Sequence, residues 1–331
     1  MLENKIELNE KQWNKKEIRR NANKIARGIL GYELIMFFII IGDLIRRIIQ
    51  FYVSNKKLDL DTQLDKIGSQ AINSGTATMV SIFMGFLFLL FYFWKCDYRK
   101  EIFHSKEKMT GEAFFMLLTI FMSVQVIFSL LGTGIEAGLN QFGLSILGEI
   151  ESASGKSNTI SMLLYASFIG PITEEIVFRG FVMRGFQKYG KYYAIIMSAV
   201  IFGAFHGNLI QGVFAGMVGL VLGYVATKYS IKWSILLHII NNFIFGDLLS
   251  YLTTNSNKSM QSMVVYVIEG AFFAGAIVII ILKRNKIKEC LKVRKVEKGL
   301  MKLTFTSVWL LIFLGFQILQ GISGIQRLPV S

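Results

Sequence analysis

Three ionisable side chains lie close together within an apolar segment of the chain. Residues 170–180 read GPITEEIVFRG and contain Glu174, Glu175 and Arg179. On an α-helix Glu175 and Arg179 are four residues apart, so they share one face, with the acid on the N-terminal side, the better order for an ion pair. Glu174 is rotated by about 100° from Glu175. The spacing therefore predicts one carboxylate paired with arginine and a second left free for acid–base chemistry.

Two of the three histidines lie in or at the end of apolar segments, whereas His104 lies in a charged loop and is expected to be solvated. An antiparallel helical hairpin that turns at Gly190 would place Glu174 and His206, each 16 positions from the turn, at a similar depth. His238 is expected about two helical turns from a membrane surface, so it reaches that depth only through a tilted or broken helix. The spacing therefore allows Glu174, His206 and His238 to form one site but does not require it.

His238 and Asn242 repeat the spacing of four residues in another apolar segment. On one helix face, an imidazole and a carboxamide could both donate hydrogen bonds to a single oxygen. An oxyanion hole needs such a pair of donors. The alternative is that these polar residues, with the neighbouring Asn241, form hydrogen bonds between helices and only hold the bundle together.

Membrane-spanning helices have to position these side chains. Hydrophobic residues occupy 53% of the 331 positions and only two residues are proline, a balance typical of membrane proteins. About 20 apolar residues are needed for a helix to cross the hydrocarbon core. We therefore predict an all-α polytopic membrane protein with about nine transmembrane helices and a catalytic core of four. The predicted spans are 28–50, 76–94, 112–133, 159–182, 193–207, 209–227, 233–252, 262–282 and 303–321.

Two of these spans are irregular. Arg46 and Arg47 interrupt the first, and the short fifth span meets the sixth at Gly207 and Asn208. Either span could be a broken or tilted helix.

The distribution of Lys and Arg predicts the orientation of the chain. With the N-terminus in the cytoplasm, the inside segments hold 27 basic residues and the outside loops six. Basic residues accumulate on the cytoplasmic side, so this orientation is expected. The same excess explains the net charge of +14, because it lies where anionic lipid of the inner leaflet would be. The charge indicates membrane lipid as a partner and gives no reason to expect nucleic acid.

The cytoplasmic segments carry no evident chemistry. The N-terminal segment 1–27, which contains KKEIRR, is expected to be a solvated tail that sets the topology, with an interfacial amphipathic helix as the alternative. Cys96 and Cys290 both lie in or beside predicted cytoplasmic loops, so we expect neither a disulfide nor a thiol metal cluster. No cleavable signal peptide is evident.

Glycines recur along the sixth predicted span at spacings of four and three residues. They are Gly212, Gly216, Gly219 and Gly223. Small residues at such spacings let membrane helices approach closely. We expect them to pack this helix against its neighbours, and dimerisation through the same face is the alternative.

Together, three motifs resemble those of the CAAX protease and bacteriocin-processing (CPBP) family of intramembrane proteases. They are Glu174-Glu175-x-x-x-Arg179, Phe202-x-x-x-His206 and His238-x-x-x-Asn242, in the contexts PITEEIVFRGFV, IFGAFHGN and LLHIINNF. Their order and their setting in membrane segments agree with the family. The resemblance covers roughly residues 159–250 and leaves the first three and last two spans without a motif.

The resemblance implies a role for each motif residue. Glu174 with His206 would activate a water molecule, Glu175 and Arg179 would support the site, and His238 with Asn242 would stabilise the oxyanion. The family is often labelled a metalloprotease, and His206, His238 and one glutamate could in principle hold zinc. No His-Glu-x-x-His is present, and a desolvated glutamate can itself serve as general base. We expect the mechanism without metal.

The resemblance also divides the chain. We predict a cytoplasmic segment 1–27, N-terminal transmembrane helices over 28–158, a catalytic core over 159–252, and C-terminal helices with a basic loop over 253–331. The expected location is the bacterial plasma membrane. The substrate would be a prenylated or other membrane-associated peptide or protein, and the sequence indicates neither which one nor an oligomeric state.

Three classes of function follow. The first is an intramembrane endopeptidase that uses a water activated by glutamate and histidine. The second is a membrane scaffold or bacteriocin immunity factor that keeps the fold without needing catalysis. The third is a proton-coupled transporter that uses the glutamates as a relay, although no internal repeat of the kind found in many transporters is evident.

Overall fold

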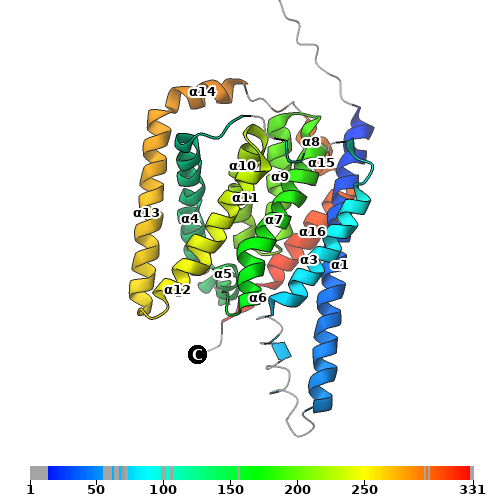
Figure 1. The fold of residues 1–331 in the computed structure, drawn as a ribbon, viewed down its shortest axis with the longest axis vertical. Helices are drawn as coiled ribbons and strands as arrows, with labels where there is room; N and C mark the ends of the chain where they lie inside the picture. Colours follow the sequence, from blue (N-terminus) through cyan, green and yellow to red (C-terminus); the bar gives the residue numbers. More distant parts are fainter. Residues whose placement is uncertain are drawn as a thin grey trace, which may run out of the picture.

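The computed structural model describes residues 14–54, 62, 67–68, 70, 74–97, 102–104, 107–154, 157–293, 296 and 299–328. Within these residues the protein is a bundle of helices, joined at one end by a single pair of two-residue antiparallel strands, β1 (Leu144–Ser145) and β2 (Gln326–Arg327) (Figure 1). The prediction of an all-α polytopic membrane protein is confirmed.

The helices before the motif region are α1 (Lys15–Ser54), α3 (Gly75–Tyr92), α4 (Gly111–Asn140) and the short α5 (Leu147–Ser154). The helices after it are α13 (Lys258–Leu282), α14 (Arg284–Val293), α15 (Leu300–Phe305) and α16 (Val308–Ser323). Between them the motif region forms four rods.

The first rod runs without interruption through α6 (Ile160–Leu164), the π-helix η2 (Tyr165–Ile169), α7 (Gly170–Glu175), the π-helix η3 (Ile176–Val182) and α8 (Met183–Gln187). The second and third are α9 (Lys191–Phe205) and α10 (Leu209–Lys228). The fourth runs from α11 (Ile231–Ile239) through the π-helix η4 (Ile240–Leu248) to α12 (Leu249–Thr253).

Each of the nine predicted spans corresponds to a helix or rod of the described chain. Seven are long and apolar enough to cross a membrane. The other two, α9 and α16, have 15 and 16 residues. At 1.5 Å per residue, a helix of this length covers about 23 Å of a hydrocarbon core that is about 30 Å thick. Helix α9 is therefore too short to cross the core by itself, in agreement with the short fifth predicted span.

The break between α9 and α10 is held by helices from outside the motif region. Gly207 adopts a left-handed conformation with φ of 59°, which glycine tolerates. Asn208 caps α10 by accepting a hydrogen bond from Gln211 N at 2.9 Å. Glu149 on α5 accepts from Leu209 N at 3.1 Å, and its carbonyl accepts from the Asn208 amide at 2.9 Å. Irregular backbone at membrane depth requires such burial in protein.

The glycines of α10 let it lie directly against α9. A Cβ placed on Gly203 of α9 would lie 2.5 Å from Gly212 O and 3.1 Å from the Cα of Gly216. Farther along, Gly219 faces Ala199 and Gly223 faces Ile195. The expected packing role of these glycines is confirmed, and the close approach fixes α9 relative to α10.

The described parts of the five predicted cytoplasmic segments, 1–27, 95–108, 184–191, 228–232 and 283–302, lie at one end of the bundle, the upper end in Figure 1. Ion pairs join Lys188 to Glu17 at 2.7 Å, Lys228 to Glu107 at 3.7 Å and Lys283 to Glu112 at 3.1 Å. If each predicted span crosses the membrane once, every second connecting segment lies on the same side, so this clustering is expected. That this end faces the cytoplasm stays a prediction.

The N-terminal segment differs from the expected solvated tail. Helix α1 begins at Lys15, and Ile18, Ala22 and Ile25 are each only 1% exposed in the core. These residues recur at intervals of four and three, which makes an apolar stripe on one helix face. Residues 1–13 lie outside the described part of the chain. From Lys15 onward the basic segment is therefore the first turns of a packed helix.

Candidate active site

The carboxylate of Glu175 lies at the centre of the motif residues and is completely buried. Its Oε1 accepts hydrogen bonds from Arg179 Nη1 at 2.8 Å and from His238 Nδ1 at 3.0 Å. Its Oε2 accepts a short hydrogen bond from Ser234 Oγ. The ion pair expected from the four-residue spacing is therefore present. With three donors around it, Glu175 is positioned as an anchor for its neighbours.

Arg179 makes contacts with two neighbouring helices through one face and the edge of its guanidinium. It is 1% exposed, and its Cζ lies 4.2 Å from the centre of the Phe202 ring on α9. Its Nη2 donates to Gly219 O on α10 at 3.4 Å. One arginine thus joins the first rod to both α9 and α10, through the flat shape and multiple donors that distinguish arginine from lysine.

His238 lies between the two glutamates. Because a carboxylate only accepts, the 3.0 Å contact with Glu175 requires a proton on Nδ1. Its Nε2 then faces Glu174, whose Oε2 is 3.7 Å away. The Glu174 side chain is 23% exposed, whereas that of Glu175 is fully buried. The structure therefore separates an anchored carboxylate from a more accessible one, as the spacing of the two glutamates predicted.

His206 lies at the end of α9, beside the break. Its Nδ1 is 2.9 Å from Phe202 O, and since a carbonyl only accepts, Nδ1 carries the proton. In the neutral imidazole, Nε2 is then an acceptor. The described hydrogen bonds do not join His206 to Glu174. The Phe178 and Phe202 rings, each 12 positions from Gly190, are 5.0 Å apart, so the hairpin has the expected register.

Asn242 has a neighbour that the sequence does not indicate. Its Nδ2 donates to Ala166 O on η2 at 2.9 Å, while its Oδ1 accepts from Asn241 Nδ2 at 2.9 Å. Asn241 Oδ1 in turn accepts from Gln125 Nε2 of α4 at 2.7 Å. This chain of amides links α4 to the fourth and first rods. One hydrogen of the Asn242 amide is therefore engaged, which leaves the second for any ligand.

The motif residues lie on or beside π-helical turns. Glu174 and Glu175 fall between η2 and η3, Arg179 is within η3, and Asn242 is within η4. A π turn closes hydrogen bonds to the fifth residue rather than the fourth, and such turns are frequent at functional sites. They shift the residues away from the straight α-helical faces assumed from the sequence. This shift accounts for Asn242 reaching Ala166.

Several residues near the site were missed by sequence reasoning. Ser234 lies four residues before His238, so the same spacing rule could have identified it. The Tyr32 ring comes from α1, far away in sequence, and stacks on Phe205, next to His206 in the chain, with 5.7 Å between the ring centroids. Asp247 accepts from Ser167 Oγ at 2.7 Å and links η4 to η2. Nothing in the spacing marks Tyr32.

The side chains do not form a usual catalytic zinc site. Among the residues that the structure describes, no three His, Cys, Asp or Glu side chains converge as metal ligands would. The usual site takes three protein ligands. The chemistry below is therefore derived from the chain's own groups.

Comparisons with known proteins cover the same region. The model of the Rce1-like family, described as type II CAAX prenyl endopeptidase Rce1-like, matches residues 156–244, which include every motif residue. The Bacillus subtilis (strain 168) protein named "Putative membrane peptidase YdiL" is 24% identical over 151 residues, 44% of this chain and 62% of that protein. The chain thus covers less than two thirds of this relative's length. No solved structure matches the chain. The resemblance to the CPBP family is confirmed for the segment that carries the motifs.

Proposed function

We propose that this multi-pass membrane protein is an intramembrane endopeptidase in which Glu174 is the general base. The observation that carries the proposal is the contrast between two adjacent carboxylates. The carboxylate of Glu175 accepts hydrogen bonds from Arg179, His238 and Ser234. Glu174 is 23% exposed, and its Oε2 lies 3.7 Å from Nε2 of His238. Ionisable groups at membrane depth are costly and mark functional sites. The match to an endopeptidase family over residues 156–244 supports this class of reaction.

The first step is attack by water on the scissile carbonyl carbon. Glu174 takes a proton from the water as the oxygen forms its bond to carbon, and the carbonyl oxygen becomes an oxyanion. Nε2 of His206 is oriented by the bond from Nδ1 to Phe202 O and accepts the second hydrogen bond of the same water. When the tetrahedral intermediate collapses, the carbon–nitrogen bond breaks and protonated Glu174 returns its proton to the leaving amine.

The oxyanion needs donors that are already in place. Asn242 offers the amide hydrogen that does not bond to Ala166 O. His238 is fixed by Glu175 at Nδ1 and donates from Nε2 when both ring nitrogens carry protons. Glu175 and Arg179 act by holding these groups and do not touch the substrate.

The substrate class follows from where the site lies. Glu174 is within a membrane-spanning rod, so the scissile bond must belong to a peptide that enters or lies against the membrane. We propose a membrane-associated peptide or protein as substrate, prenylated or not, and the bacterial plasma membrane as the location.

The test is cleavage by the purified full-length protein. A substrate is first identified by comparing membrane peptides from wild-type and deletion cells. Glu174→Gln and His206→Ala are expected to fold normally and to lose at least about 10²-fold in cleavage rate, the lower range for a general base. Glu151→Gln makes the same chemical change on exposed α5 and is expected to retain the wild-type rate.

A scaffold or immunity factor with the same fold is the second candidate. The observation in its favour is that Asn242, Asn241 and Gln125 are bonded to one another and to backbone as helix-to-helix links. In that case Glu174→Gln would complement a deletion fully. A transporter would instead be revealed by uptake into proteoliposomes that Glu174→Gln abolishes.

A further inference from the structure

A basic pocket and an apolar groove are lined by successive stretches of the same two segments, α3 with the turn after it and the first rod, at the predicted cytoplasmic end. The pocket has a volume of about 530 Å³, and the groove has about 520 Å³. Both fall within the range of small-molecule sites. Neither is lined by a motif glutamate or histidine, so the catalytic proposal leaves them without a role.

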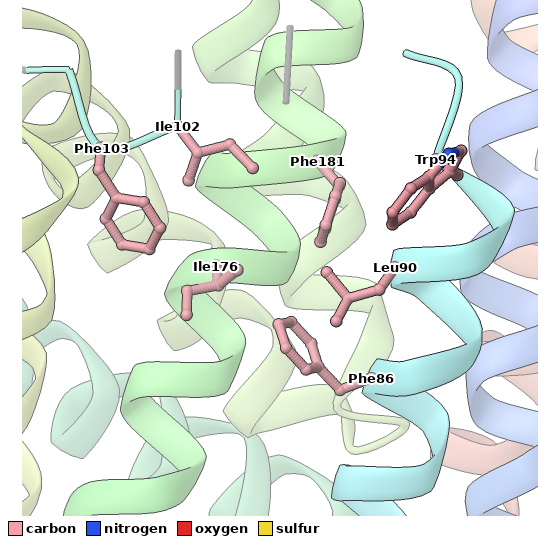
Figure 2. A pocket seen from close by; sticks show the side chains of 7 residues that line it. All are labelled: Phe86, Leu90, Trp94, Ile102, Phe103, Ile176 and Phe181. Atoms are coloured by element: carbon pink, nitrogen blue, oxygen red, sulfur yellow. The ribbon is translucent and has the colours of Figure 1, made fainter. Parts of the chain in front are cut away.

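The groove runs between α3 and the first rod (Figure 2). Phe86 and Leu90 of α3, with Trp94 in the turn after it, line one side, and Ile176 and Phe181 of η3 line the other. Trp94 is 64% exposed, whereas Phe181 is fully buried. A large exposed aromatic at the end of a span is typical of the membrane interface. The groove is thus open towards the hydrocarbon and suited to an alkyl chain.

In both segments the residues that line the pocket follow closely on those that line the groove. Lys95 follows Trp94 directly, and Arg184 comes three residues after Phe181, almost one helical turn farther along. Arg184 is only 4% exposed, and its Nη1 donates to Gln187 at 2.7 Å. The lining changes from aromatic to cationic near the ends of the predicted spans 76–94 and 159–182.

The positive charge of the pocket favours binding of an anion. Lys95, Arg184 and Lys188 line it together with one carboxylate, Asp97. Lys24 bonds to Cys96 at 3.1 Å, and Glu17 pairs with Lys188 at 2.7 Å. With these two included, four cations stand against two carboxylates. Basic pockets between membrane helices on the cytoplasmic side bind anionic lipid head groups.

We infer that the pocket and groove together bind one anionic phospholipid, with its phosphate at Lys95 and Arg184 and an acyl chain along Trp94 and Phe181. The charge complementarity and the change from basic to apolar lining both favour a molecule with a charged head and a long tail. Ile176 adjoins Glu175 in the chain, so this lipid would contact the outer side of the rod that carries both glutamates. The inference is independent of the proposed protease activity.

Native mass spectrometry of the full-length protein in detergent tests the inference. Phosphatidylglycerol and phosphatidylcholine with identical acyl chains are titrated separately. We expect phosphatidylglycerol to bind at least about fivefold more tightly, the effect of one basic residue near an anionic surface. Lys95→Gln should remove about that factor and leave phosphatidylcholine binding unchanged. Lys286→Gln removes the same charge on exposed α14 and should change neither affinity.

Two further measurements distinguish the contribution of the lipid head group from that of the acyl chain. Trp94→Ala is expected to weaken the binding of both lipids. Glycerol phosphate, which has no acyl chain, should not displace phosphatidylglycerol at equal concentration. The inferred lipid site would be wrong if the two lipids bound with equal affinity. It would also be wrong if Lys95→Gln and Lys286→Gln lost equal affinity for phosphatidylglycerol. Full displacement by glycerol phosphate would equally contradict it. If Trp94→Ala impairs peptide cleavage but not lipid binding, the groove belongs to the substrate and the lipid assignment fails.

Discussion

His238 Nδ1 and Glu175 Oε1 are 3.0 Å apart, although 63 residues separate them in the chain. This hydrogen bond connects the first and fourth rods of the motif region and orients Nε2 of His238 towards Glu174. The second motif glutamate therefore acts on the site through the histidine that it holds. Glu174 and His206 are positioned by different contacts, so the two carboxylates are expected to respond differently to substitution.

Ser234→Ala tests the anchoring of Glu175. The Ser234 hydroxyl is completely buried and donates its one hydrogen to Glu175 Oε2, with Leu222 O as a second acceptor within 3.2 Å. Removing a hydrogen bond to a charged group costs about 1.5–3 kcal/mol, so the variant should unfold at a lower temperature in detergent and cleave more slowly. Ser259→Ala, on an exposed turn of α13, is the matched control. Equal stability of the two variants would show that Ser234 does not support the carboxylate.

Arg179→Lys is expected to be harmful although it keeps the charge. The guanidinium pairs with Glu175, reaches Gly219 O and lies over Phe202 at once, and an ammonium cannot occupy all three positions. We expect a loss of about 1–3 kcal/mol in stability, the usual range for disturbing a buried network, together with slower cleavage. Thermal unfolding and cleavage rate are the measurements. Wild-type values for both would contradict the network.

Sequence patterns predicted the helices and the Glu175–Arg179 pair because both depend on local spacing. Hydrophobic runs mark the nine segments, and the four-residue spacing marks the ion pair. The basic segments also predicted which ends of the helices gather together. These features need no knowledge of tertiary contacts.

The remaining features depend on contacts between distant segments. The π turns place Asn242 against Ala166, and no residue in the sequence marks a π turn. Tyr32 of α1 stacks on Phe205, next to His206, and Glu149 of α5 supports the break after His206. The first turns of α1 pack in the core even though KKEIRR reads as a solvated tail. In each case, tertiary packing overrides or completes a local signal.

Gln317 and Glu33 form a second buried polar pair, between α16 and α1. Gln317 Nε2 donates to Glu33 Oε1 at 2.5 Å, and the other oxygens, Glu33 Oε2 and Gln317 Oε1, have no partner among the described residues. Gln317→Leu removes the donor and should cost about 1–3 kcal/mol. Glu33→Gln should be tolerated, because its new N–H can donate to Gln317 Oε1.

Thermal unfolding in detergent distinguishes these outcomes. Gln320→Leu changes an exposed glutamine on the same helix and serves as the control for Gln317→Leu. If Glu33→Gln destabilises the protein as much as Gln317→Leu, the carboxylate of Glu33 is needed as a charge, and the pair does not act as a simple hydrogen-bonded link.

Chelation distinguishes a glutamate mechanism from one that needs zinc. Because Glu174 can take the proton from water without a Lewis acid, cleavage by the purified protein is expected to survive exhaustive treatment with a chelator, with no stoichiometric metal found by elemental analysis. Asn242→Ala should still lose about 10² to 10³-fold in rate, as removal of one oxyanion donor does. If chelation abolishes cleavage and added zinc restores it, His206, His238 and Glu174 must rearrange into a ligand set, and the metal-free mechanism is wrong. If added zinc restores cleavage by the wild-type protein but not by His206→Ala, His206 is one of those ligands.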